Sequence, residues 1–180
     1  SDTQGSSPGA FAATATLPFQ DSFETGSLED WTNGQGTGTR QIVTDTAAKG
    51  AKSFYFRNLG SLNHFNGISR SFADGTRPQS ISFWVRSGST TTYDGYFSLH
   101  DRTHQTEVIR FFAGGSGKFC VQEEDLGDES FSYQAGVWYH VEFRNMNWAI
   151  KNFDYYVNGA LIKEGIPFLR QEWVDEITQL

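Results

Sequence analysis

Cysteine is almost missing from this sequence, in which Cys120 stands alone among 180 residues. A single thiol can form neither an intrachain disulfide nor a thiolate metal cluster. Its apolar neighbours predict a small, buried side chain. A single cysteine does not indicate whether the protein works in a reducing or an oxidising compartment, because bacterial secreted domains often carry no disulfide.

Long apolar runs and positive charge are also scarce. No run approaches the roughly 18 to 20 residues that a membrane-spanning helix needs, so we expect a soluble protein without membrane insertion. Lysine and arginine number 14 against 21 acidic residues, which gives a net charge of -7, and they are scattered along the chain. Dispersed and outnumbered positive charge argues against a nucleic-acid partner.

The helical period is missing too, since no stretch of eleven or more residues repeats apolar positions at the spacing of an α-helix. Alternation with period two recurs instead, in segments rich in aromatic and β-branched residues and bounded by turn formers. These segments are 18–23, 40–45, 52–58, 67–72, 79–87, 94–101, 106–114, 117–122, 137–145 and 152–159. Many short strands without helices predict an all-β fold, an antiparallel two-sheet β-sandwich.

Two further signals concern the local organisation. Asn158-Gly159 stands between two strand-like runs and predicts a tight hairpin. Residues 1–16 are small and polar, which is typical of a linker or a processed amino terminus, and residues 17–180 form the single domain. The tail 168–180 fits either a helical turn or another strand.

Four segments together carry a resemblance to a known family. They are PFQDSFETGSLEDW at 18–31, SISFWVRS at 80–87, GVWYHVEF at 136–143 and FDYYVNGALI at 153–162. This combination resembles the laminin G-like branch of the concanavalin A-like lectin and glucanase superfamily. The resemblance implies a jelly-roll sandwich over residues 17–180 and says little about chemistry. The end, VDEITQL, only weakly matches the last strand of such domains, so whether the chain includes that strand stays open.

Alternation sorts each central strand into a core face and a face that mixes aromatic rings with hydrogen-bonding groups. A glycan needs flat rings for stacking and planar polar groups for its hydroxyls. The mixed face supplies both, and the candidate ligand-binding residues are Trp84, Arg86, Tyr96, His100, Arg110, Trp138, His140, Glu142, Asp154 and Tyr156. The alternative is that these residues only form a solvated outer face.

Residue patterns that could indicate catalysis are weaker than those that indicate glycan binding. Glu123 and Asp125 have the spacing of a retaining glucanase pair, but Gly127 interrupts the alternation, so an acidic turn is favoured over glycoside hydrolysis. On a straight strand His100 and His104 would lie about 13 Å apart, too far to chelate one ion. The distance shrinks if residues 101–105 turn. A polar hairpin loop is favoured over a metal site. His140, Tyr156 and Arg144 distantly resemble the residue sets of jelly-roll polysaccharide lyases, whose motif strings are absent.

A calcium site is the one cofactor that the sequence suggests. Asp21, Glu24 and Asp30 flank a turn and offer the hard oxygen ligands that calcium prefers, so we expect a structural calcium ion there, with a solvated acidic turn as the alternative. The function that fits best is non-catalytic carbohydrate binding by an extracellular, bacterial-type domain of a larger secreted or cell-surface protein. A polysaccharide-active enzyme, a lyase before a hydrolase, and an adhesive domain without a small ligand stay open.

Overall fold

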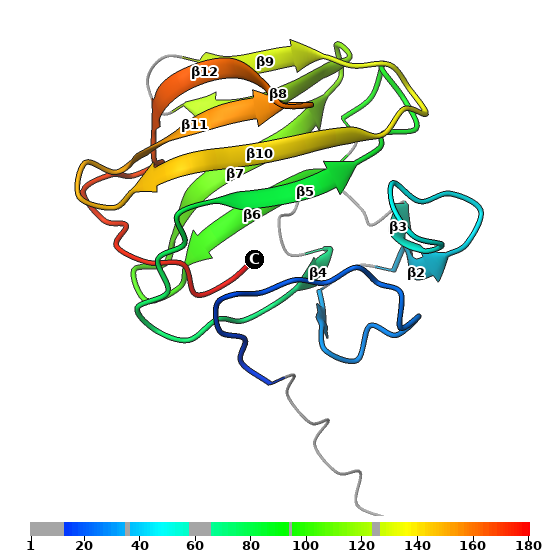
Figure 1. Cartoon of the computed structure of the whole chain (residues 1–180), viewed down its shortest axis with the longest axis horizontal. Helices are drawn as coiled ribbons and strands as arrows, with labels where there is room; N and C mark the ends of the chain where they lie inside the picture. The colour runs from blue at the N-terminus through cyan, green and yellow to red at the C-terminus, as the bar shows by residue number, and fades with distance from the viewer. Residues whose placement is uncertain (1–12, 35–36, 58–65, 94, 124–126) are drawn as a thin grey trace, which may run out of the picture.

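The computed structural model describes residues 13–34, 37–57, 66–93, 95–123 and 127–180. Over these residues the chain forms strands β1 to β12 and no helix. Two four-stranded antiparallel sheets pack face to face (Figure 1), which confirms the predicted all-β sandwich. In this part of the chain, no helix is long and apolar enough to cross a membrane.

The first sheet, in front in Figure 1, has the strand order β12-β11-β10-β5. Its strands are β5 (Ile81–Val85), β10 (Tyr139–Asn147), β11 (Asn152–Val157) and β12 (Ala160–Pro167). Along β11 every second side chain is buried, and β10 follows the same rule over its first six residues. This alternation turns one face of the sheet to the core and leaves the other outside.

The second sheet has the strand order β6-β7-β8-β9. Its strands are β6 (Tyr96–Asp101), β7 (Thr106–Gly114), β8 (Lys118–Glu123) and β9 (Gly127–Ser132). The C-terminal residues extend it beyond β6, because Gln179 bridges to both His100 and Ser71. The tail therefore forms turns over 169–173 and then this extended pairing.

Two short strand pairs lie beside the sandwich (Figure 1). They are β1 (Thr32–Asn33) with β4 (Ile68–Ser69), and β2 (Thr39–Val43) with β3 (Ser53–Arg57). The strand expected over 18–23 is absent, and the nearby pairing is instead a single bridge from Ala15 to Phe72. Phe23 donates its N–H to Asp21 Oδ1 at 2.7 Å, which closes the segment into a turn.

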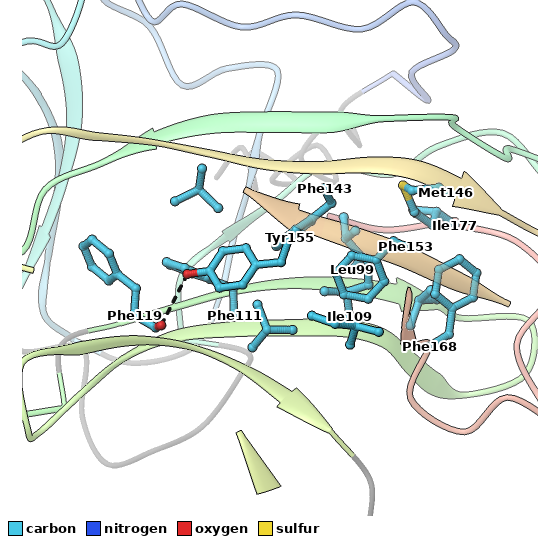
Figure 2. Close-up of a cluster of buried hydrophobic side chains, with 14 of the residues drawn as sticks. Leu99, Ile109, Phe111, Phe119, Phe143, Met146, Phe153, Tyr155, Phe168 and Ile177 are labelled. Carbon is cyan, nitrogen blue, oxygen red and sulfur yellow. Dashed lines mark hydrogen bonds between the residues drawn. The ribbon is translucent and has the colours of Figure 1, made fainter. Parts of the chain in front are cut away.

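Aromatic rings fill the space between the two sheets (Figure 2). Phe143, Phe153 and Tyr155 come from the first sheet and Phe119 from the second, and all four are fully buried. The Tyr155 hydroxyl donates to the Phe119 carbonyl oxygen at 3.3 Å, which ties β11 to β8 through the core. Burial raises the pKa of Tyr155, so this hydroxyl remains a donor at neutral pH.

Cys120 lies in β8 and is buried, as predicted. Burial, with a further contribution from the negative charge of Asp128, raises the pKa of its thiol to about 11. The thiol is therefore protonated at neutral pH and inert as a nucleophile.

The predicted Asn158-Gly159 hairpin is confirmed. Val157 pairs with Ala160, which leaves a two-residue loop between β11 and β12. Asn158 has φ 50° and Gly159 has φ 78°, as expected for a type I′ turn.

Gly159→Ala is expected to lower the free energy of unfolding by about 1 kcal/mol, because alanine tolerates a positive φ poorly. No atom lies within 4 Å of the position that the new Cβ would take, so backbone strain alone causes the loss. Urea unfolding measures it. Gly67→Ala is the control, since that site is equally open and has no positive φ. Equal losses in both variants would contradict the strain argument.

Candidate functional site

The ten residues predicted to bind a ligand all lie outside the core, but on two faces rather than one. The outer face of the first sheet, named here the Trp84 face, holds Trp84, Arg86, Trp138, His140, Glu142, Asp154 and Tyr156. The outer face of the second sheet, named the Arg110 face, holds Tyr96, His100 and Arg110. The structure therefore does not bring all ten residues together on one surface, because β5 and β6 belong to different sheets.

Trp84 forms the exposed aromatic part of the Trp84 face. It pairs with His140 in the register of β5 and β10, and the two rings stack with centroids 4.8 Å apart and an interplanar angle of 23°. Lys49 brings its Nζ to 5.6 Å from the indole. Trp84 still has 39% of its surface exposed, so part of this large ring is free to contact a ligand.

A carboxylate and a guanidinium continue the Trp84 face along β10. Arg144 donates from Nε and NH2 to the two oxygens of Glu142, both at 2.8 Å. Its guanidinium also lies 4.3 Å from the centre of the Tyr156 ring. Hydrogen bonds from Arg144 hold the pKa of the Glu142 carboxyl below its usual value, although burial acts in the opposite direction. Glu142 is thus a charged acceptor at neutral pH.

The remaining members of the Trp84 face are tied to neighbouring loops. Trp138 donates from Nε1 to Thr46 Oγ1 at 3.0 Å, and Arg86 donates from Nε to the carbonyl oxygen of Gly136 at 2.9 Å. Asp154 accepts from the side chain of Asn145 and from the backbone N–H of Gly165. These hydrogen bonds fix the orientation of all three side chains on the Trp84 face.

The Arg110 face carries a polar network in partly buried surroundings. Arg110 forms hydrogen bonds with both carboxylate oxygens of Glu107, and its NH1 donates to Gln122 Oε1 at 2.6 Å. His100 Nε2 lies 3.9 Å from Glu107 Oε1. Ser98 Oγ, on the same face, is buried without a hydrogen-bond partner among the described residues. Burial raises the pKa of Tyr96 beside this network.

An open pocket of about 420 Å³ adjoins the Arg110 face at the turn from β6 to β7. His100, Arg102, Gln105 and Thr106 line it. Arg102 is held there by its hydrogen bond to Gln179 Oε1 at 2.7 Å. Residues 102–105 form a turn, so the chain does not run as a straight strand from His100 to His104 and the separation of about 13 Å expected for a strand does not apply.

The three predicted calcium ligands are only partly brought together. Asp21 and Asp30 line a second open pocket of about 420 Å³ near the start of the domain. Asp21 accepts from Trp31 Nε1 at 2.6 Å, and Arg70 donates to the backbone oxygen of Asp30. Glu24 instead accepts the backbone N–H groups of residues 51 and 52 at 3.0 and 2.8 Å. The calcium site stays a prediction. The test compares the thermal midpoint of the chain in excess calcium with that in excess chelator, and calcium binding to the folded state should raise it.

The last residue of β8, Glu123, carries a carboxyl group in an unusual environment. The Glu123 side chain is buried with Oε1 lacking a hydrogen-bond partner among the described residues. Burial raises the pKa of Glu123, and the negative charge of Glu129 raises it further. Asp125, which has the spacing of a retaining-glucanase pair with Glu123, lies outside the described residues.

Glu123→Gln is expected to stabilise the fold at neutral pH. The folded-state pKa of Glu123 lies above the unfolded value, so its contribution to stability is fully present below the unfolded pKa and is lost as the pH rises through the folded pKa. Glutamine does not titrate, and its gain in thermal midpoint over the native chain should therefore grow between pH 4 and pH 8. Glu164→Gln on exposed β12 is the control. A gain independent of pH would contradict this explanation.

Comparisons with known proteins support the fold and leave the family open. No protein-family model matches the sequence, and no curated protein matches it in a sequence search. A solved chain named "Cellulose induced protein, Cip1" has a TM-score of 0.57 and 15% identity, over 88% of this chain and 85% of its own. A solved chain named "Sialidase" has a TM-score of 0.51 and 20% identity, over 62% of this chain and 10% of its own. The present chain thus spans about a tenth of that sialidase. Both likenesses agree with the two-sheet β-sandwich fold.

Proposed function

We propose that this chain is a non-catalytic carbohydrate-binding domain of a secreted or cell-surface protein, and that the Trp84 face binds the sugar. The observation that carries the proposal is the exposed Trp84 ring, which stands outside the core beside the Glu142–Arg144 pair. A pyranose offers an apolar C–H face to such a ring and hydroxyls to such a pair.

The arrangement of the Trp84 face is rigid, which favours binding. Every member sits on or directly beside a paired strand, and Trp84 is held by its stack on His140. Glu142 and Arg144 hold each other in one orientation through two hydrogen bonds. Few side-chain rotations are therefore lost when a ligand binds, so more of the contact energy appears as affinity.

The names of the two structural neighbours agree with a carbohydrate context. One is named a sialidase and the other a cellulose-induced protein. Their sequences share too little with this chain to carry a substrate across. They add support to the proposal and leave the glycan itself to experiment.

A second candidate function, an enzyme that acts on polysaccharides, is favoured by the Arg110 face. There Arg110, Glu107 and His100 lie together beside an open pocket, as charged groups of a reaction centre would. The raised pKa of buried Glu123 does not add to this centre, because Glu123 alternates with Gln122 on β8 and faces the opposite side of the sheet.

A glycan-array screen combined with two product assays tests the proposal. The full chain is applied to the array, and every bound polysaccharide is then incubated with it and examined for new reducing ends and for unsaturated products. Binding without product supports the carbohydrate-binding domain. Product formation means that the chain is an enzyme and overturns the non-catalytic proposal. The absence of any bound glycan across neutral and acidic polysaccharides overturns both candidate functions.

A further inference from the structure

Three potential metal ligands converge where the β6–β7 turn meets the C-terminal segment. Asp101 is the last residue of β6, His104 lies in the turn, and Glu176 comes from the tail. One ligand atom of each residue lies within 4.8 Å of those of the other two. This cluster is separate from the Trp84 face, and the spacing of His100 and His104 in the sequence does not reveal it, because Glu176 is remote along the chain.

Backbone groups hold the two carboxylates in place. Asp101 Oδ1 accepts the N–H of His104 at 3.0 Å, and its Oδ2 accepts the N–H of Asp175 at 3.0 Å. Glu176 accepts the N–H of Gly75. The His104 ring is oriented by Nδ1, which lies 2.7 Å from Asp101 Oδ2. Three segments remote in sequence therefore place the ligand set before any ion arrives.

Among the described residues, the one basic side chain within ion-pair distance of the two carboxylates is His104, whose Nδ1 lies 2.7 Å from Asp101 Oδ2. Asp101 is 0% exposed and Glu176 is 8% exposed, and within the described residues no lysine or arginine forms a salt bridge with either. Two carboxylates close together in a buried place repel each other unless a positive charge lies between them. A divalent cation supplies that charge.

We propose that Asp101, His104 and Glu176 bind one divalent transition-metal ion, with Zn²⁺ as the best fit. One imidazole nitrogen with two carboxylate oxygens suits zinc, which takes three protein ligands and a water in open sites. Calcium is disfavoured, since it requires six to eight oxygen ligands. This ion is therefore distinct from the calcium predicted at Asp21, Glu24 and Asp30.

Small side-chain movements complete the site. Ligands of one tetrahedral zinc lie about 3.3 Å apart. The His104 Nδ1–Asp101 Oδ2 distance of 2.7 Å must therefore open slightly when the ion enters, and the other ligand atoms, which all lie within 4.8 Å of one another, must adjust to the same spacing. The side chain of His104 is 42% exposed and can rotate, whereas the two carboxylates stay on their backbone donors. Zinc binds the neutral imidazole and the ionised carboxylate, so its affinity should fall at acidic pH, where protons compete with the ion for its ligands. The bound ion joins the β6–β7 turn to the C-terminal segment.

Titration of the chelator-stripped full chain with zinc chloride tests the proposal. Calorimetry should give one zinc per chain, and zinc at 100-fold above its Kd should raise the thermal midpoint by about 5 °C or more. Cobalt(II) in place of zinc should give the visible absorption of a low-coordinate site. Calcium at the same concentration should not compete with either ion.

Conservative variants locate the ion. His104→Gln and Glu176→Gln should each weaken zinc binding by at least about tenfold, and glutamine at 176 can still accept the Gly75 N–H. His100→Gln is the matched control, a histidine four residues away in the same hairpin, and it should bind zinc as the native chain does. Unchanged affinity in His104→Gln, equal loss in His100→Gln, or no zinc bound by the native chain overturns the proposal. None of these outcomes depends on glycan binding.

Discussion

Phe153→Ala is expected to lower the free energy of unfolding by about 3–5 kcal/mol, whereas Tyr156→Ala, three residues along the same strand, should lower it by about 1 kcal/mol or less. Phe153 is 1% exposed and packs edge-on against Phe143, with ring centroids 5.2 Å apart, so truncation opens a cavity. Tyr156 faces outward and loses mainly its contact with the Arg144 guanidinium. Urea unfolding of both variants measures the difference.

The same two variants separate stability from binding. Tyr156→Ala should weaken a glycan found on the array while Phe153→Ala, if it remains folded, should bind it with native affinity. Tyr156→Phe is the control, since it keeps the ring beneath Arg144. Equal destabilisation by the two alanine variants would mean that Tyr156 contributes to packing and would remove it from the proposed surface.

Alternation in the sequence predicts much of this fold because burial on one face is the dominant force on a strand of a sandwich. Phe153, Tyr155 and Val157 share a face in the pattern, and all three are buried. The hairpin at Asn158 follows equally directly, since its turn type depends on only two residues. Local features of this kind need no knowledge of the rest of the chain.

Partnership between strands cannot be predicted in the same way. Trp84 and Tyr96 are only twelve positions apart, and both point outward, yet one lies on each sheet because β5 pairs with β10 while β6 pairs with β7. The choice depends on how the loops between strands cross the sandwich, which a period of two does not encode. For the same reason the ten candidate ligand-binding residues are divided between the Trp84 face and the Arg110 face.

The candidate sites show the same limit at the level of single side chains. Glu142 and Arg144 are two residues apart on one strand, so alternation predicts that they share a face. Asp101 and Glu176 meet only because the tail returns beside β6, where Thr178 donates its N–H to the His100 carbonyl oxygen at 2.9 Å. Glu24, one of the predicted calcium ligands, likewise accepts hydrogen bonds from the N–H groups of residues 51 and 52, which lie 27 and 28 positions away in the sequence.

Trp84→Ala is expected to weaken glycan binding by at least about 2 kcal/mol, a loss of about 30-fold in Kd, and to change folding stability far less. The exposed part of the indole supplies the stacking area for the sugar. The imidazole of His140 cannot replace it, because His140 stacks against Trp84 itself. With 39% of its surface exposed, Trp84 leaves no closed cavity when truncated. Isothermal titration with a bound oligosaccharide measures the affinity, and urea unfolding measures the stability.

Trp173→Ala is the matched control for this prediction. Trp173 is 59% exposed, lies in the C-terminal turn and is absent from both outer sheet faces, so its removal tests whether any exposed indole contributes to binding. Native affinity in Trp173→Ala together with the loss in Trp84→Ala would locate the sugar on the Trp84 face. If Trp84→Ala binds as the native chain does while Arg110→Ala does not, the ligand occupies the second sheet instead, because the two faces lie on opposite sides of the sandwich and cannot contact one sugar ring together.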